Sequence, residues 1–299
     1  MVDLVTFKQH RMAYGCMRIS GTWQASEVTT AMRESGIRAV HHAYEVGFRV
    51  FDHADIYGQG ECERIFGDAL RQRPSMRDDI VIATKCGIRF AGEPAGAPGR
   101  YDFSAAHIVE SCEKALARLG VDCIDLYQLH RPDLLMDPHE VADALGGLVD
   151  SGKVRWIGVS NFLPSTLDLL QKSLSHKIVS QQIECSLLHR EPLFDGTLDQ
   201  CLANEIVPMA WSPLAGGRLS GDSTNTGLIE ALTNVASSLN ASQSQVALAW
   251  LMRHPSRVMP VVGTTNLERI TESFAAAQVR LSREDWYSLL VAAQGHPMA

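Results

Sequence analysis

Residues 47–58 read GFRVFDHADIYG, where the apolar run FRVF ends on a carboxylate, Asp52, and Tyr57 follows five residues later. Six more short apolar runs are each followed by a polar, charged, aromatic or glycine residue: IVIAT before Lys85, IDLYQL before His130, WIGV before Ser160 and Asn161, KIVSQ before Gln182, IVPMA before Trp211, and MPVV before Gly263. In a closed barrel of parallel strands, the C-terminal ends of all the strands lie at the same face. The pattern therefore predicts that these scattered residues meet in one pocket.

Helical patterns alternate with the apolar runs. One apolar stripe leads to a stop at Gly47, a second runs from Ser104 to Gly120, and a third begins at the cap formed by Asp137 and a following proline. Further helices fit residues 164–174, 197–204, 226–239 and 266–276. Because no linker interrupts the alternation, the sequence predicts one domain over residues 1–299, an α/β fold of the (β/α)8 TIM barrel type.

The two ends of the chain fall outside this alternation. Residues 5–20 contain two short strand-like pieces, which predict an N-terminal β-hairpin that closes the bottom of the barrel and leads into its first strand. Residues 281–293 predict an added C-terminal helix that opens at Ser282, with two acidic residues in its first turn.

The composition is that of a globular protein with a small-molecule partner. The formal charge is −7 and the basic residues are spread along the chain, which argues against a nucleic-acid or anionic membrane surface. No stretch approaches the roughly 18 apolar residues of a membrane span, and the first residues lack a signal core, so we expect a cytoplasmic protein. The seven cysteines form no Cys-x-x-Cys pair and predict reduced thiols. Cys86 stands out because the neighbouring Lys85 could lower its pKa.

Two long stretches follow candidate site strands. Residues 91–102 and 214–227 are rich in glycine, proline and small polar residues. Long loops at the C-terminal face of a barrel usually shape or cover a pocket, so we interpret them as substrate and cofactor loops. Trp23, Arg89 and Phe90 are plausible walls of that pocket.

The 47–58 stretch resembles the signature of the aldo-keto reductases, in which an apolar run ends on an Asp and Tyr-Gly begins five residues later. Later blocks of that family are matched in order over nearly the whole chain: ATK at 83–85, DLYQLHRPD at 125–133, GVSNF at 158–162, QIE at 182–184 and AWSPLAGG at 210–217. The resemblance implies an enzyme that reduces aldehyde or ketone carbonyls to alcohols with a catalytic tetrad of Asp52, Tyr57, Lys85 and His130.

The tetrad implied by the resemblance is chemically coherent. A tyrosine with an ordinary pKa of about 10 is a weak acid, and a lysine held beside it by a carboxylate favours the phenolate. Tyr57 would then be the general acid that protonates the developing alkoxide, while His130 orients the carbonyl. The hydride must come from a cofactor, because no side chain donates one.

The resemblance also implies a binding site for NADPH. It assigns the nicotinamide carboxamide to Ser160, Asn161 and Gln182, the ring face to Trp211, and the pyrophosphate path to Ser212, Leu214, Gly216 and Arg218. The adenosine 2′-phosphate would lie at Gly263, Thr264, Thr265 and Arg269, with Glu272 near the adenine. Two positions depart from the family: Gly263 stands where many members have lysine, and Ser273 where many have asparagine. No GxGxxG element is present, so the barrel itself must bind the nucleotide.

Several alternatives stay open at this stage. His130 could simply be paired with Asp125 or Asp133, and Asp52 with Lys85 could be a structural ion pair. His53 and Asp55 are potential metal ligands, but the other strand ends offer too few partners, and we expect no metal. The chain could instead be an NADP-binding regulatory subunit resembling channel-associated β subunits. It could also be an aldolase-like lyase in which Lys85 forms a Schiff base.

Overall fold

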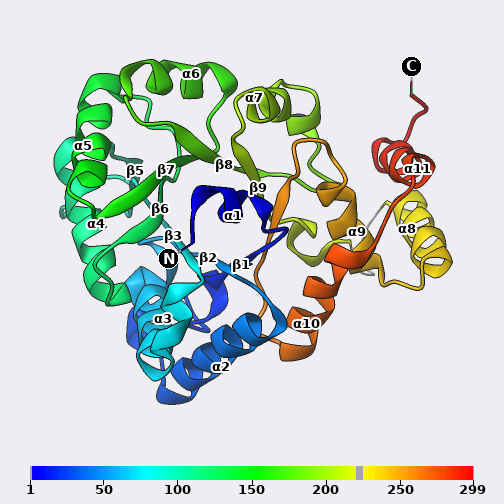
Figure 1. The fold of residues 1–299 in the computed structure, drawn as a ribbon, viewed down its shortest axis with the longest axis horizontal. Helices are drawn as coiled ribbons and strands as arrows, with labels where there is room; N and C mark the ends of the chain where they lie inside the picture. Colours follow the sequence, from blue (N-terminus) through cyan, green and yellow to red (C-terminus); the bar gives the residue numbers. More distant parts are fainter. Residues whose placement is uncertain (1, 220–224, 299) are drawn as a thin grey trace.

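The computed structural model describes residues 2–219 and 225–298, and within them the parallel strands form the predicted closed barrel. Figure 1 looks along this barrel, with the helices arranged around it. Its strand order is β1-β10-β9-β8-β7-β6-β3-β2. The barrel strands are β1 (Ala13–Gly15), β2 (Val50–Asp52), β3 (Val81–Cys86), β6 (Ile124–Leu129), β7 (Val154–Ser160), β8 (Ile178–Glu184), β9 (Val207–Trp211) and β10 (Met259–Val262). A separate antiparallel pair, β4 (Ile88–Arg89) and β5 (Arg100–Tyr101), forms the base of the 91–102 loop.

The predicted helices are present with nearly the predicted bounds, and two further helices, over residues 61–72 and 243–252, were not predicted. Together these helices are α2 (Thr30–Val46), α3 (Glu61–Gln72), α4 (Ala105–Leu119), α5 (Pro138–Asp150), α6 (Pro164–Ser173), α7 (Thr197–Ala203), α8 (Thr226–Ser238), α9 (Gln243–Met252), α10 (Leu267–Ala275) and α11 (Arg283–Gln294). Short 3-10 turns lie at Cys16–Arg18, Ala25–Glu27, Tyr57–Gly60, Pro74–Asp78, Glu191–Leu193, Ala215–Gly217 and Ala276–Gln278. Ser104, Asp137 and Ser282 are N-caps whose side chains accept backbone N–H groups, and Gly47 closes α2 at φ 119°.

The predicted N-terminal hairpin is wrong. Leu4–Gln9 is a helix, α1, because the Asp3 side chain caps it by accepting the N–H of Thr6 at 2.7 Å. One side chain of the helix, Phe7, is fully buried and stacks on Trp156 with ring centres 5.6 Å apart. α1 therefore lies across the bottom of the barrel, as Figure 1 shows, and β1 follows it as a barrel strand between β10 and β2.

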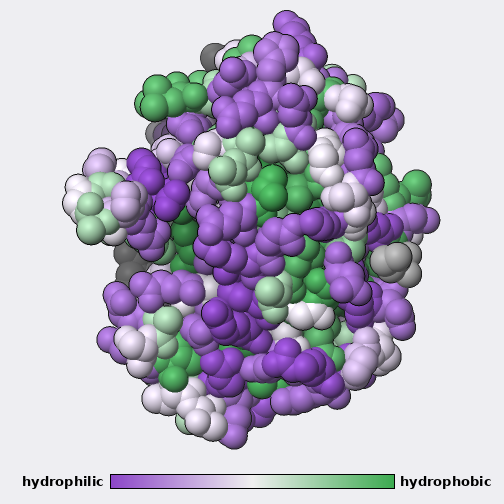
Figure 2. Space-filling view, turned by 90° about the vertical axis from the view of Figure 1, so that its left-hand side faces the viewer, coloured by the Kyte–Doolittle hydropathy of each residue, from purple (hydrophilic) through white to green (hydrophobic). Residues whose placement is uncertain are grey.

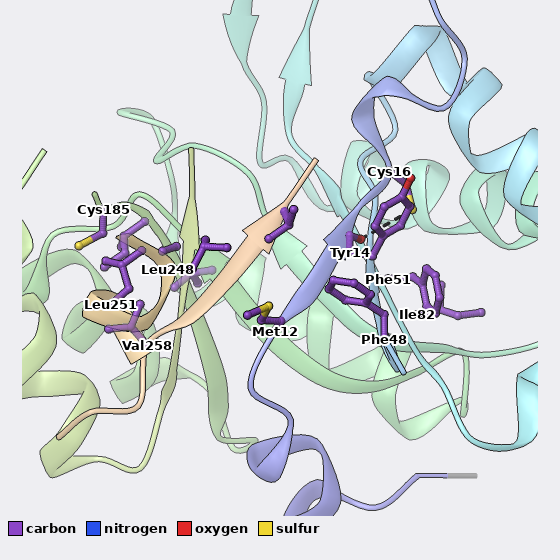
Figure 3. Close-up of a cluster of buried hydrophobic side chains, with 14 of the residues drawn as sticks. Met12, Tyr14, Cys16, Phe48, Phe51, Ile82, Cys185, Leu248, Leu251 and Val258 are labelled. Carbon is purple, nitrogen blue, oxygen red and sulfur yellow. Dashed lines mark hydrogen bonds between the residues drawn. The ribbon is translucent and has the colours of Figure 1, made fainter. Parts of the chain in front are cut away.

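The core lies mainly between the strands and the helices around them. Figure 3 shows part of this layer, where the Tyr14 ring on β1 meets Phe48 and Phe51 edge-on at 5.8 and 5.9 Å. Figure 2 shows the flank over α4 and α5, which is mostly hydrophilic with apolar side chains in small patches. Among the described helices, none has the length and apolar character needed to cross a membrane.

The added C-terminal helix is present and is fastened to α9 by two tryptophans. The rings of Trp250 and Trp286 stack at 5.0 Å, and each indole N–H donates to the backbone carbonyl of the other residue, at 3.1 and 3.0 Å. The sequence analysis did not predict α9 itself. Residues 246–252 of this helix are all buried, so they show no amphipathic stripe.

The barrel interior leaves no room for another side chain at Gly158 on β7. A Cβ atom there would lie 2.2 Å from the Ser180 hydroxyl and 2.9 Å from Cγ of Gln128. The two neighbours are themselves joined, since the Gln128 amide donates to the Ser180 hydroxyl at 3.2 Å.

We expect Gly158→Ala to lower the free energy of unfolding by about 1–3 kcal/mol, the usual effect of overpacking a core. Gly147→Ala on the exposed side of α5 is the control, because its Cβ would meet no atom within 4 Å. That change should stabilise the helix by up to about 1 kcal/mol. Denaturant unfolding of both variants checks this, and equal effects would contradict the packing described for Gly158.

Candidate active site

The four residues of the implied tetrad lie together at the C-terminal end of the barrel. Asp52 ends β2, Lys85 lies near the end of β3, His130 directly follows β6, and Tyr57 lies in the turn after β2. The Lys85 ammonium donates to both Asp52 carboxylate oxygens at 2.8 Å. It also donates to the backbone carbonyl of His53 at 2.7 Å and to the Tyr57 hydroxyl at 3.4 Å. Lys85 is fully buried, so this ammonium depends on these four contacts.

The charges of the site follow from burial and from this ion pair. Burial alone would lower the pKa of Lys85, but Asp52 and Tyr57 outweigh it and raise that pKa. For Tyr57 burial is the largest influence and raises the pKa, while Lys85 opposes it. The expected easing of proton loss from Tyr57 is thus present but smaller than the effect of burial. Tyr57 keeps its proton at neutral pH.

His130 is held in its neutral form. Burial, followed by the nearby charges of Lys85 and Arg131, holds its pKa well below 6.5. Its ring meets the Tyr57 ring edge-on, with centres 6.0 Å apart. The site thus brings together a protonated phenol, a neutral imidazole and a buried ammonium, which can stabilise an oxygen that gains negative charge.

Neither carboxylate considered as a partner of His130 contacts it. Asp125 pairs with Arg77 and Arg155, at 2.9 and 2.8 Å. Asp133 accepts the backbone N–H groups of Phe103 and Leu135.

The turn that carries Tyr57 requires glycine. Gly58 and Gly60 have φ of 54° and 88°, in the left-handed region. A Cβ on Gly60 would lie 2.8 Å from Cδ of Arg118, so the Arg118 side chain packs directly beneath the turn. The local sequence therefore bends sharply after Asp52 and returns Tyr57 toward Lys85.

A buried carboxylate behind the tetrad was not found from the sequence. Glu63 on α3 is fully buried and accepts the Thr84 hydroxyl at 2.6 Å and Nε of Arg118 at 2.5 Å. These bonds join β3, α3 and α4 directly behind Lys85. The available signal was an acidic residue within the apolar stripe of α3.

Three other residues near the tetrad have pKa values shifted by burial. His53 is fully buried, and burial lowers its pKa to about 3. Burial, together with Glu63, raises the pKa of Asp55 to about 7. Within the described residues, no group of His, Cys, Asp and Glu is arranged to hold a metal. The pKa of Cys86 is raised by burial, so the expected lowering by Lys85 is wrong.

The residues that the resemblance assigns to the nicotinamide lie next to one another and are joined by hydrogen bonds. The Trp211 indole N–H donates to the Asn161 side-chain oxygen at 2.9 Å, and the Asn161 amide donates to the Ser160 hydroxyl at 2.8 Å and to the His130 carbonyl at 3.2 Å. Gln182 is paired with Ser160 between β7 and β8, its backbone carbonyl accepts the N–H of Asn161 at 2.8 Å, and its side-chain amide donates to Asp52 at 2.9 Å.

Arg131, which the sequence analysis did not single out, lies against Trp211. The carbon of its guanidinium is 5.2 Å from the centre of the Trp211 ring.

The residues assigned to the pyrophosphate follow β9. Ser212 and Gly216 have positive φ, Gly216 and Arg218 are exposed, and Leu214 is half-buried. Nε of Arg218 donates to the Ala215 carbonyl at 3.0 Å. Residues 220–224 of the predicted 214–227 loop lie outside the described residues.

The residues assigned to the 2′-phosphate lie between β10 and the first turn of α10. Gly263 is exposed, Thr264 and Thr265 are half-buried, and the Asn266 side chain caps the helix by accepting the N–H of Arg269 at 3.0 Å. The Arg269 side chain is exposed and forms no ion pair with any described residue. Glu272 instead accepts the Ser242 hydroxyl.

With this geometry in place, comparison with known proteins decides the family. The sequence model of the aldo/keto reductase family matches residues 11–290. The chain belongs to this family. It is 39% identical to oxidoreductase YdhF of Escherichia coli over 279 residues, 93% of each chain, and 40% identical to 6-dehydroglucose reductase of Agrobacterium fabrum over 291 residues, 97% of this chain and 96% of that one.

Solved structures agree with the barrel of this aldo-keto reductase. The aldo/keto reductase from Klebsiella pneumoniae, solved in complex with NADP and acetate, aligns with a TM-score of 0.77 and 26% identity, over 97% of this chain and 93% of that one. The protein is therefore an enzyme of the oxidoreductase class. The lyase hypothesis also conflicts with the geometry, because a Schiff-base lysine must lose its proton and Lys85 is held as an ammonium by Asp52.

Proposed function

We propose that this enzyme reduces the carbonyl group of small aldehydes or ketones to an alcohol, with NADPH as the cofactor and Tyr57 as the general acid. The observation that carries the proposal is the contact between the Tyr57 hydroxyl and the buried Lys85 ammonium, at 3.4 Å. This contact gives a proton donor whose conjugate base is stabilised by a fixed positive charge.

The residues present fit a nicotinamide cofactor. Trp211 offers a half-buried aromatic face whose orientation is fixed by Asn161. We assign the carboxamide to Ser160, Asn161 and Gln182, and the pyrophosphate to the glycine-rich backbone after β9. The start of α10, with the hydroxyls of Thr264 and Thr265 and the free guanidinium of Arg269, suits the 2′-phosphate that distinguishes NADPH from NADH.

The proton transfer then follows from the tetrad. When bound, NADPH supplies the hydride that reduces the carbonyl carbon. Tyr57 donates its proton to the carbonyl oxygen as negative charge develops there, and the phenolate that remains faces Lys85. His130, neutral and adjacent, donates a hydrogen bond to the same oxygen. Asp52 keeps Lys85 charged throughout, and Tyr57 regains a proton from water after the alcohol leaves.

The regulatory-subunit hypothesis has less support. Its only basis is that a non-catalytic barrel would also hold NADP, whereas the curated relatives include proteins named for reductase activity. The name 6-dehydroglucose reductase, which two of these relatives share, supports an oxygen-rich aldehyde as a substrate to test first.

The change Tyr57→Phe removes only the phenolic hydroxyl. We expect turnover of carbonyl substrates with NADPH to fall at least about 100-fold, the scale of a lost general acid, while NADPH affinity stays within about twofold. Tyr287→Phe, at an exposed tyrosine of α11, is the matched control and should keep full activity. Steady-state rates at saturating substrate decide the matter, and more than half of the wild-type turnover in Tyr57→Phe would remove Tyr57 from the mechanism.

Arg269→Ala tests the assignment of the 2′-phosphate. Losing charge-assisted hydrogen bonds of roughly 1.5–3 kcal/mol should weaken NADPH binding about 10- to 100-fold and leave NADH binding unchanged. Arg283→Ala, at an exposed arginine of α11, controls for the loss of one surface cation. Titration of both cofactors measures the effect. Equal losses for NADPH and NADH, or no loss for either, would show that Arg269 does not bind the 2′-phosphate.

A further inference from the structure

A half-buried arginine stands beside the proposed reaction site without a role in it. Arg131 directly follows His130 at the end of β6, and its guanidinium lies against the Trp211 ring at 5.2 Å. It thus contacts the residue assigned to the nicotinamide and is adjacent to the residue assigned to the carbonyl.

The ring that this guanidinium contacts is held in place by hydrogen bonds. The Trp211 ring is fixed by its bond to Asn161, and Asn161 in turn donates to the backbone carbonyl of His130. Arg131 is therefore tied to the same small unit by its backbone at one end and by the stacking of its side chain at the other. A guanidinium that stacks on an aromatic ring uses its flat face, so its N–H groups stay available at the edge.

The positive charge of Arg131 is not balanced by the protein. Within residues 2–219 and 225–298, no carboxylate lies within 4.0 Å of its guanidinium and no hydrogen bond is made by it. Arg89, which follows β3 at the same end of the barrel, differs because it pairs with Asp102 at 3.1 Å. The nearby carboxylate of Glu184, whose Cα is paired with that of Trp211, is 3.9 Å from a ring nitrogen of His189.

We propose that Arg131 binds a carboxylate of the substrate, so that the enzyme prefers carbonyl compounds that carry a carboxylate a few bonds from the reacting carbon. The proposal rests on the carbonyl reduction proposed above. A guanidinium presents two parallel N–H groups that match the two oxygens of a carboxylate. A bound carboxylate would supply the counter-charge that the protein withholds, whereas a neutral substrate leaves the half-buried cation unpaired.

The local electrostatics are consistent with this position. Arg131 is one of the charges, after burial and Lys85, that hold the pKa of His130 low, so its charge is felt at the reaction site.

The test compares 4-oxobutanoate with butanal, two four-carbon aldehydes that differ by the carboxylate. In wild-type enzyme with NADPH, kcat/KM should favour 4-oxobutanoate. Arg131→Met, which keeps an unbranched side chain able to pack on Trp211, should lower kcat/KM for 4-oxobutanoate about 10- to 100-fold, mainly through KM. The same change should leave butanal within about threefold. Arg131→Lys, which keeps the charge but not the two parallel donors, should restore part of the loss.

Binding without turnover separates this inference from the proposed function. Succinate carries the same carboxylate but no reducible carbonyl, and its affinity by calorimetry should fall in Arg131→Met and not in Arg283→Met, a change at an exposed arginine of α11. Equal losses on both aldehydes, or an effect confined to NADPH affinity, would overturn the proposal, since Arg131 would then only support Trp211 or the cofactor. If wild-type enzyme bound succinate through Arg131 but reduced neither aldehyde, the carbonyl-reductase function would fail and the carboxylate site would stand.

Discussion

The buried ammonium of Lys85 is the constraint on which the site depends. An unpaired charge in a protein interior is costly, so every group around Lys85 must act as an acceptor. Asp52 at the end of β2, and the His53 carbonyl and the Tyr57 hydroxyl in the turn after it, accept from Lys85. The Gln182 amide on β8 donates to Asp52. The sharp glycine turn at 58–60 and the Glu63 bonds behind β3 both serve to keep this set of acceptors in place.

This arrangement gives neighbouring groups different protonation states. Burial pushes Tyr57 and His130 toward their neutral forms, while the ion pair keeps Lys85 and Asp52 charged. A proton donor, a neutral hydrogen-bond donor and a fixed cation are thereby held within one small region, as reduction of a carbonyl requires. In our proposal Arg131 extends the same logic outward, because its unbalanced charge selects the substrate while the buried charge acts on the reacting oxygen.

Much of this could be predicted from the sequence, and the exceptions have physical causes. The strand ends and amphipathic helices were predicted because each leaves a periodic or terminal signal. The helix α9 was missed because it is buried on all sides, and α1 because a six-residue helix with one buried side chain, Phe7, shows no period. The bond from Gln182 to Asp52, the Glu63 network and the stacking of Arg131 on Trp211 join distant segments, and no local pattern reports such contacts.

The most direct test of this account is the pH dependence of alcohol oxidation with NADP⁺, where the Tyr57 phenolate must act as the base. The comparison is between the wild type and the double variant Asp52→Asn with Lys85→Met, which removes the ion pair without leaving either charge buried and unpaired. Lys85 lowers the pKa of Tyr57 against the effect of burial, so its removal should raise that pKa and shift the rise in oxidation rate to higher pH. An identical pH midpoint in the two proteins would contradict the claim that Lys85 sets the proton affinity of Tyr57.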